Sequence, residues 1–255
     1  MIGLQKRKDA DQLMPARSGP NRSWPSPPVV FCDFDGTITQ VDVTDQILSQ
    51  FAHPSWQEIE QEWVRGLIGS RECLERQLAL VDASADELDA LIDAVPVDPG
   101  FSDFHRFLRQ RAFPLYVVSD GFDYVIRRVL RRAGVDGELR NGEHIFCSAL
   151  RVEGRRLVLS FPHSPTPCAH GCATCKADII ARLAPVDRPV IFIGDGLSDR
   201  FALERAHLIF AKRQLLAYCR EKGISCRSFE TFRDIAGALE AEWGAPPPAQ
   251  DGERA

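Results

Sequence analysis

Short and almost continuous apolar runs recur along the chain, and amphipathic stretches lie between them. The runs predict strands at Val29–Cys32, Leu115–Val118, Val190–Ile193 and Leu208–Phe210. Because polar residues hardly interrupt them, these runs are typical of parallel strands that are buried on both faces. Their alternation with helical patterns predicts an α/β fold, with a doubly wound, Rossmann-like parallel sheet.

The stretch after the second run has the periodicity of an amphipathic helix. Apolar residues recur at the spacing of one helix face, at Phe122, Val125, Ile126, Val129 and Leu130. Gly134 is placed to end this helix. Four arginines occupy the opposite side and predict a solvated face, at Arg127, Arg128, Arg131 and Arg132.

Residues 42–111 break the alternation, because their pattern predicts helices only. Ser55 with Glu58, and Ser84 with Glu87, have the spacing of a capping box at a helix start. We therefore expect a helical-bundle cap, inserted directly after the first strand. Ligands of such sheets bind beyond the carboxyl ends of the strands, so this cap is placed to close over the site as a lid.

A second insertion is expected as a β-hairpin over residues 144–150 and 156–161, with its turn near Glu153 and Gly154. The polar, proline-containing ends are typical of disordered tails. The chain is thereby divided into tails at 1–28 and 244–255, an α/β core at 29–41 and 112–243, and the cap at 42–111.

Composition narrows the classes of function. With 255 residues, 44% of them hydrophobic, the chain can form one large domain or a core with a smaller cap. A net charge of -5 does not match the basic footprint of a nucleic-acid-binding protein. No apolar run is long enough to span a membrane, and the N-terminus lacks the apolar centre of a signal peptide. We therefore expect a cytoplasmic protein whose eight cysteines are reduced.

Candidate chemical groups gather where the predicted strands end. They are Asp33, Asp35 and Thr37 after the first strand, Ser119, Asp120 and Gly121 after the second and opening a helix, Lys176 on a helix expected to begin near Ala173, and Asp195 and Asp199 after the third. Two carboxylates this close repel each other unless a cation lies between them, and a divalent metal with oxygen ligands is such a cation. A helix N-terminus, a hydroxyl and a lysine can hold a phosphate. The set is typical of phosphoryl transfer.

In this order the four groups resemble the motifs of the haloacid dehalogenase superfamily of phosphohydrolases, over all of the chain except its tails. The resemblance implies that Asp33 is a nucleophile that forms an aspartyl phosphate, and that Asp35 is the general acid and base. It also implies Mg²⁺ as cofactor, held by Asp33, Asp195 and the backbone carbonyl of Asp35. Asp199 would support the metal shell or the lysine.

The same resemblance assigns the phosphate-binding groups and the class of substrate. Ser119 and Lys176 match the motif residues that bind the phosphoryl group, and Thr37 and Asp120 lie beside them as further candidates. The acid at Asp35 implies a phosphatase or a phosphotransferase that acts on a small phosphorylated metabolite. A non-catalytic binding protein would be expected to lack one of the motif residues, and none is missing.

The helical insertion resembles that of the phosphoserine phosphatase branch, subfamily IB. The run Phe161-Pro162-His163-Ser164, followed by clustered cysteines and then Lys176, resembles the methionine-salvage phosphatases for 2-hydroxy-3-keto-5-methylthiopentenyl-1-phosphate. Asp42 lies where phosphoserine phosphatases carry a glutamate that recognises the substrate amine, which makes it a substrate-binding candidate. Asp120 departs from both groups, which usually have glycine there. Phosphoserine, phosphoethanolamine and phosphocholine phosphatases therefore remain alternatives, as does a phosphotransferase.

A cysteine-rich segment precedes Lys176 and contains Cys168, His170, Cys172 and Cys175. These side chains would suffice for a tetrahedral zinc site. The spacing C-x3-C-x2-C lacks the distant second pair of ordinary structural zinc sites, which favours a loop of free thiols or a labile disulfide. Whether it binds zinc or not, the segment must lie near the phosphate site, because Cys175 directly precedes Lys176.

Overall fold

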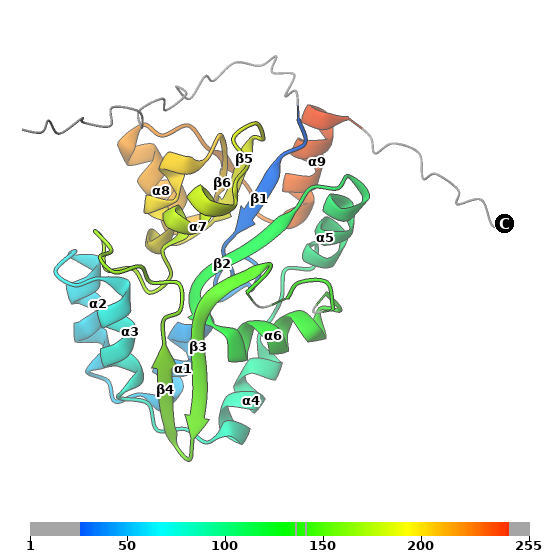
Figure 1. Ribbon diagram of the computed structural model, residues 1–255. Coiled ribbons are helices and arrows are strands. Elements are labelled where there is room, and N and C mark those ends of the chain that lie inside the picture. The colour runs from blue at the N-terminus through cyan, green and yellow to red at the C-terminus, as the bar shows by residue number, and fades with distance from the viewer. Residues whose placement is uncertain (1–25, 136, 141, 245–255) are drawn as a thin grey trace, which may run out of the picture.

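The computed structural model describes residues 26–135, 137–140 and 142–244, in which one sheet lies between layers of helices (Figure 1). The strand order is β4-β3-β2-β1-β5-β6-β7, and every neighbouring pair is parallel except β3 with β4. The strands are β1 (Val29–Cys32), β2 (Leu115–Phe122), β3 (Ile145–Glu153), β4 (Arg156–Ser160), β5 (Val190–Gly194), β6 (Leu208–Ala211) and β7 (Arg227–Ser228). The predicted doubly wound α/β sheet is confirmed.

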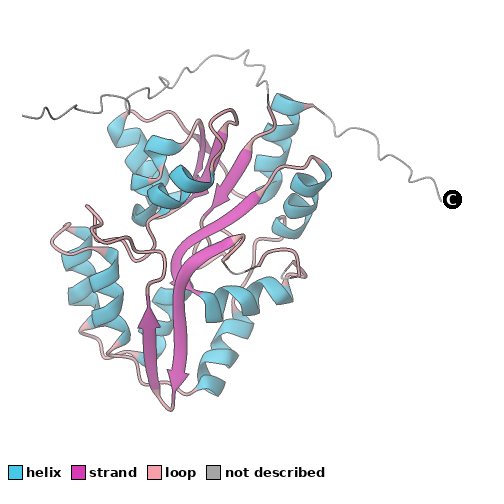
Figure 2. Cartoon of the chain, viewed as in Figure 1, coloured by secondary structure: helices cyan, strands magenta, loops and turns pink. Residues whose placement is uncertain are grey.

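The central strand β1 is buried on both faces, as its continuous apolar run predicts. Val30 and Cys32 belong to one core, and Val29 and Phe31 belong to another. Figure 2 shows helices on both sides of the strands. Residues of α5 (Phe101–Gln110), α6 (Asp123–Arg132) and α9 (Phe232–Trp243) join the first core, and residues of α7 (Lys176–Leu183) and α8 (Arg213–Lys222) join the second. No helix of the described residues is long and apolar enough to cross a membrane.

Strand β2 is longer than predicted. It continues past Val118 because β3 runs beside it and pairs Ser148 with Phe122, across an irregularity in the register. Ser119, Asp120 and Gly121 therefore lie within the strand, and α6 begins only at Asp123. The prediction that these three residues open a helix is wrong. Helix α7 likewise begins at Lys176 itself, after Ala173.

The predicted hairpin is present as β3 and β4, and Gly154 in its turn has a φ of +65°. Because β3 also pairs in parallel with β2, the hairpin is the edge of the main sheet and not a separate insertion. Past β5, two short 3-10 helices follow at Leu197–Phe201 and Leu203–Arg205.

The expected helices follow β1 as α1 (Val43–Phe51), α2 (Trp56–Val64), α3 (Ser70–Leu78) and α4 (Ala85–Ala94). We call these four the helical insert; Figure 1 shows them below the ends of the central strands, on both sides of the β3–β4 hairpin. The chain enters the insert and leaves it side by side, because Thr39 bridges Val97. The N–H of Gln40 donates to the Pro96 carbonyl at 2.8 Å, and the N–H of Asp98 donates to the Ile38 carbonyl at 2.9 Å.

Helix α5 packs on α9 beside the sheet, and the Phe232 ring lies 5.1 Å from Phe101 and 5.0 Å from Phe104. The sequence prediction places α5 in the cap at 42–111. On this packing, we propose that the inserted unit lies between Thr39 and Val97, and that α5 belongs to the core. The predicted tails lie outside the described residues, apart from Ser26–Pro28 and Gly244.

The arginines of α6 are not only a solvated face. Arg128 pairs with Asp89 at 2.7 Å and with Asp93 at 2.6 Å, and both acids belong to α4. Arg132 donates to the Ile92 carbonyl at 2.7 Å, in the last turn of α4. These contacts join the insert to the core.

The two predicted capping boxes have different outcomes. At α4 the box is formed, because the Glu87 N–H donates to Ser84 Oγ at 3.3 Å and the Ser84 N–H donates to Glu87 Oε2 at 2.8 Å. At α2 the box with Glu58 is wrong. Ser55 precedes the helix without a capping hydrogen bond, and its hydroxyl lies 2.9 Å from His53 Nδ1.

This difference gives a matched test of stability. Ser84→Ala is expected to lower the free energy of unfolding by about 1 kcal/mol, because it leaves an N–H at the start of α4 without its acceptor. Ser55→Ala is expected to change it by less than about 0.5 kcal/mol. Urea denaturation of both variants measures the two values, and equal losses would contradict the assignment.

Candidate active site

A cavity of about 260 Å³ lies at the carboxyl ends of the central strands, between the sheet and the helical insert. Its core side includes Asp33, Asp35, Ser119, Asp120 and Asp195. Its insert side includes Asp42, Asp45, Glu60, Trp63 and Gln77. Residues far apart in the sequence meet here because parallel strands all end at this edge.

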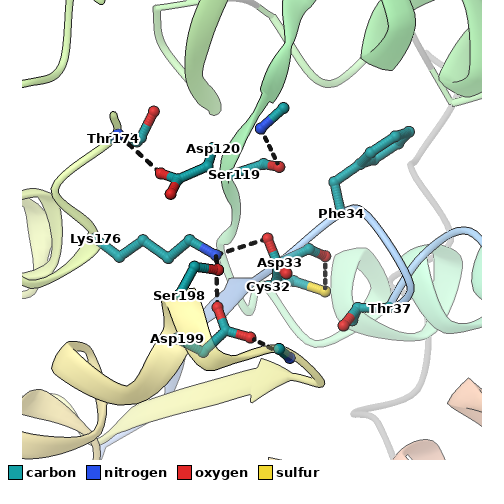
Figure 3. A network of polar contacts seen from close by, with 12 residues as sticks. Cys32, Asp33, Phe34, Thr37, Ser119, Asp120, Thr174, Lys176, Ser198 and Asp199 are labelled. Carbon is teal, nitrogen blue, oxygen red and sulfur yellow. Dashed lines mark hydrogen bonds and ion pairs between the residues drawn. The ribbon is translucent and has the colours of Figure 1, made fainter. Parts of the chain in front are cut away.

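Lys176 is the centre of the polar network in Figure 3. Its Nζ lies 2.8 Å from Asp33 Oδ1 and 2.5 Å from Asp199 Oδ1, and all three residues are buried. Burial opposes the charge on Lys176, but attraction to Asp199 and Asp33 outweighs it and raises the pKa of the lysine. The lysine therefore stays charged.

Asp199 uses both of its carboxylate oxygens within the protein. Oδ1 faces Lys176, and Oδ2 accepts the N–H groups of Asp195 and Gly196, each at 3.1 Å. Asp199 therefore holds the lysine and the turn after β5 in place, and it has little capacity left to bind a metal.

Thr37 is fully buried, and its Oγ1 donates to Asp195 Oδ1 at 2.7 Å. The other oxygen of Asp195 lies 3.3 Å from Arg213 Nη1. The Thr37 hydroxyl thus orients Asp195, while its contact with a phosphate stays a prediction.

The carboxylates of Asp33, Asp195 and Asp199 offer oxygens that all lie within 4.8 Å of one another. Burial, followed by repulsion from Asp33, raises the pKa of Asp195 to about 6. Three such acids beside one lysine leave an excess of negative charge, and hard oxygen donors suit Mg²⁺. The donor set therefore fits the expected cation, with Asp33 and Asp195 as the carboxylates that would hold it.

Asp35 connects the site to the insert. Its Oδ1 accepts the N–H of Val43, the first residue of α1, at 3.1 Å. Burial raises the pKa of Asp35 well above its ordinary value, and the charges of Asp42 and Asp33 raise it further. A carboxyl group in such surroundings can carry a proton near neutral pH.

Ser119 and Asp120 approach the cavity from β2. Ser119 Oγ accepts the N–H of Gly121 at 3.0 Å. Asp120 Oδ1 accepts the N–H of Thr174 at 2.8 Å, and burial raises its pKa. Asp120 therefore joins β2 to the segment that leads to Lys176, and its predicted contact with substrate stays a prediction.

Asp42 is the N-cap of α1, and its Oδ1 accepts the N–H of Asp45 at 3.0 Å. Burial, with the charge of Asp45, raises the pKa of Asp42 to about 7. It lines the cavity as expected of a substrate-binding candidate, although its cap role alone would explain its residue type.

Sequence reasoning missed several residues of the cavity. Arg213 lies shortly after β6, and this place behind a predicted strand marks it as a candidate site residue. Glu60, Trp63 and Gln77 have no such signal, because they are ordinary members of amphipathic helices.

In the structure the three cysteines of the cysteine-rich segment lie together, and His170 lies apart from them. The sulfurs of Cys168, Cys172 and Cys175 all lie within 4.8 Å of one another, and these cysteines are free. His170 is not in this group; its ring stacks on Phe201 with 3.7 Å between the ring centroids.

This fold, with its acids gathered around a buried lysine, is typical of phosphohydrolases. Residues 30–204 match the haloacid dehalogenase-like hydrolases, and the chain belongs to this family. The chain is 32% identical over 215 residues to a 2-hydroxy-3-keto-5-methylthiopentenyl-1-phosphate phosphatase of Geobacillus kaustophilus, covering 83% of this chain and 95% of the relative. It is 31% identical over 214 residues to the phosphatase of the same name from Bacillus mycoides, with the same coverage.

Solved structures agree on the fold. A substrate-bound phosphoserine phosphatase superposes with a TM-score of 0.64 at 19% identity, covering 84% of this chain and 98% of that one. A phospho-aspartyl intermediate analogue of phosphoserine phosphatase has a TM-score of 0.62, also at 19% identity, and covers 83% and 98%.

The close approach of Gly121 to Asp35 gives a test of the site. A Cβ at position 121 would lie 2.3 Å from Asp35 Oδ2, whereas a Cβ at Gly237 in α9 would meet nothing within 4 Å. Gly121→Ala is expected to lower kcat/KM by roughly a hundredfold, because it displaces the carboxyl group. Gly237→Ala should leave kcat/KM unchanged and stabilise the helix by about 0.5–1 kcal/mol. Hydrolysis of an aryl phosphate with Mg²⁺ measures the first effect, and thermal unfolding measures the second. Full activity of Gly121→Ala would contradict the assignment.

Proposed function

We propose that this protein is a Mg²⁺-dependent phosphomonoesterase that acts on a small phosphorylated metabolite through an aspartyl phosphate on Asp33. One observation carries the proposal: the Asp33 carboxylate faces the cavity while Lys176, 2.8 Å away, is held by Asp199 on its other side. This arrangement places a nucleophile beside a fixed positive charge, as displacement at phosphorus requires.

In the first half-reaction an Asp33 oxygen attacks the phosphorus and the bond from phosphorus to the leaving oxygen breaks. The Lys176 ammonium offsets charge on the phosphoryl oxygens, and the Ser119 hydroxyl helps to hold them. Asp35 protonates the leaving alcohol, which its raised pKa allows. When bound at Asp33 and Asp195, Mg²⁺ supplies further neutralisation of that charge.

In the second half-reaction water attacks the aspartyl phosphate and releases inorganic phosphate. Asp35, now a carboxylate, accepts the proton of this water and returns to its starting state. Its bond to the Val43 N–H keeps the carboxyl group oriented in both steps. The two half-reactions together consume one water and restore Asp33.

For the substrate, we propose 2-hydroxy-3-keto-5-methylthiopentenyl-1-phosphate or a close analogue, as in methionine salvage. The names of relatives at 31–32% identity over nearly their full length support this choice. The insert side of the cavity supports it as well, because Trp63, Cys73 and Leu74 offer an aromatic ring, a sulfur and an aliphatic group. Such surfaces suit a thioether chain.

A second candidate is an amine-bearing phosphate such as phosphoserine, phosphoethanolamine or phosphocholine. Asp42, Asp45 and Glu60 favour it, since three acids on the insert side of the cavity would attract a cationic group. A phosphotransferase would use the same first half-reaction and pass the phosphoryl group to an alcohol in place of water.

The proposed nucleophile can be tested with a nearly isosteric change. Asp33→Asn is expected to lower aryl phosphate hydrolysis by at least about a thousandfold, because an amide does not attack phosphorus. Asp187→Asn, at an exposed site, is the matched control and should keep full activity. Circular dichroism should show both variants folded. Retained Mg²⁺-dependent hydrolysis in folded Asp33→Asn would overturn the assignment.

A panel of phosphorylated metabolites tests the substrate. We expect the highest kcat/KM for the methylthiopentenyl phosphate, and little change for this substrate in Glu60→Gln. If an amine-bearing phosphate is hydrolysed best, and Glu60→Gln or Asp45→Asn lowers its kcat/KM by roughly tenfold through loss of a charge contact, the second candidate is the better one. Adding an alcohol and measuring its phosphorylation distinguishes transfer from hydrolysis.

A further inference from the structure

Three thiols converge in the loop at residues 161–175, between β4 and α7, which we call the cysteine loop. Cys172 and Cys175 are buried and Cys168 is half-buried, and their sulfurs all lie within 4.8 Å of one another. Within residues 26–135, 137–140 and 142–244, no other set of three cysteine or histidine side chains converges in this way. The proposed phosphatase mechanism uses none of these thiols.

The arrangement suits a shared ion better than a disulfide. Sulfurs around a tetrahedral zinc ion lie about 3.8 Å apart when the bonds are about 2.3 Å long, which is compatible with the observed cluster. A disulfide would bring one pair to about 2.05 Å and leave the third thiol unpaired beside it. Soft thiolate ligands also select zinc over the hard cations that carboxylates prefer.

A backbone N–H and the start of a helix face the sulfurs of the cluster. The Cys172 N–H donates to Cys168 Sγ at 3.5 Å. Cys175 also stands at the N-cap of α7, where the helix dipole stabilises negative charge. Such N–H contacts orient metal-binding thiolates.

We propose that Cys168, Cys172 and Cys175 bind one zinc ion, whose fourth position is open to water on the exposed side of Cys168. His170 is excluded as a ligand because its ring stacks on Phe201 outside the group. This site is distinct from the carboxylate site at Asp33 and Asp195, and it does not rest on the proposed function.

The contacts of the cysteine loop indicate what the ion would hold in place. The Gly171 carbonyl accepts the Arg71 N–H at 3.0 Å, and Ser70 Oγ accepts the Ala173 N–H at 3.0 Å. Both partners belong to α3 of the insert. The loop and the start of α3 approach each other closely, because a Cβ at Gly69 would lie 2.3 Å from the Gly171 carbonyl oxygen.

The same loop reaches the core at Asp120, which accepts the Thr174 N–H, and it leads into α7 at Lys176. The loop contains no helix or strand of its own. An ion bound to three of its residues would therefore fix the junction of α3, β2 and α7.

The test uses the full-length chain, reduced and reconstituted with Zn²⁺ or Co²⁺. We expect about one zinc per chain by elemental analysis, and less than about a tenth of that in the variant that combines Cys168→Ser, Cys172→Ser and Cys175→Ser. The Co²⁺ form is expected to show a thiolate-to-cobalt charge-transfer band and intense visible absorption. Cys226→Ser, at a cysteine outside the cluster, is the matched control and should keep both signals.

Two further variants separate this site from its neighbours. His170→Ala should retain the metal, and loss of the metal in this variant would overturn the three-thiolate assignment. Asp195→Asn should retain the thiolate-to-cobalt band even where phosphatase activity is lost. Absence of zinc from the reconstituted wild type, equal zinc in the triple variant, or a disulfide within the cluster after reduction and reconstitution would each overturn the proposal.

Discussion

The buried ammonium of Lys176 is the interaction on which the rest of the site depends. A charge so far from water is strongly destabilising unless it is paired and hydrogen-bonded. Asp33 after β1 and Asp199 after β5 supply that pairing, while the lysine itself comes from the first turn of α7. The three segments can meet only because β1 and β5 are parallel neighbours that end at the same edge.

The acids around this lysine also connect the chemistry to the insert. Asp35 is pushed toward its protonated form by burial and by nearby acids, and the Val43 N–H at the start of α1 opposes this. The position of α1 and the protonation of Asp35 are therefore coupled. Asp120 connects the sheet to the cysteine loop, since it lies on β2 and accepts a hydrogen bond from the loop that leads to Lys176.

The central strands and the acids that follow them could be predicted from the sequence. Continuous apolar runs identify buried parallel strands, and the polar residues directly after each run mark the edge where the site lies. Strand β7 could not, since both its residues are exposed and no apolar run marks it. Helix α5 has the same amphipathic pattern as its neighbours, and tertiary contacts such as its packing against Phe232 separate it from the insert.

Within the site, too, prediction from sequence is limited because tertiary contacts decide which residues meet. The bond from Thr37 to Asp195 joins residues 158 positions apart, and no local pattern encodes it. The sequence groups His170 with three cysteines, whereas in the structure stacking on Phe201 holds its ring outside their cluster. Periodicity and spacing identify elements and candidate groups, but which of these groups face one another is decided by tertiary contacts.

The contact of Gly69 with Gly171 has a consequence for how the substrate of this cavity can change. The insert meets the cysteine loop there through main-chain atoms, and the Ser70 hydroxyl adds a side-chain contact with Ala173. Residues on the insert side, such as Glu60 and Trp63, line the cavity without taking part in that contact. Substitutions at Glu60 or Trp63 can therefore change the lining of the cavity, and with it the substrate, while the junction between insert and loop stays the same.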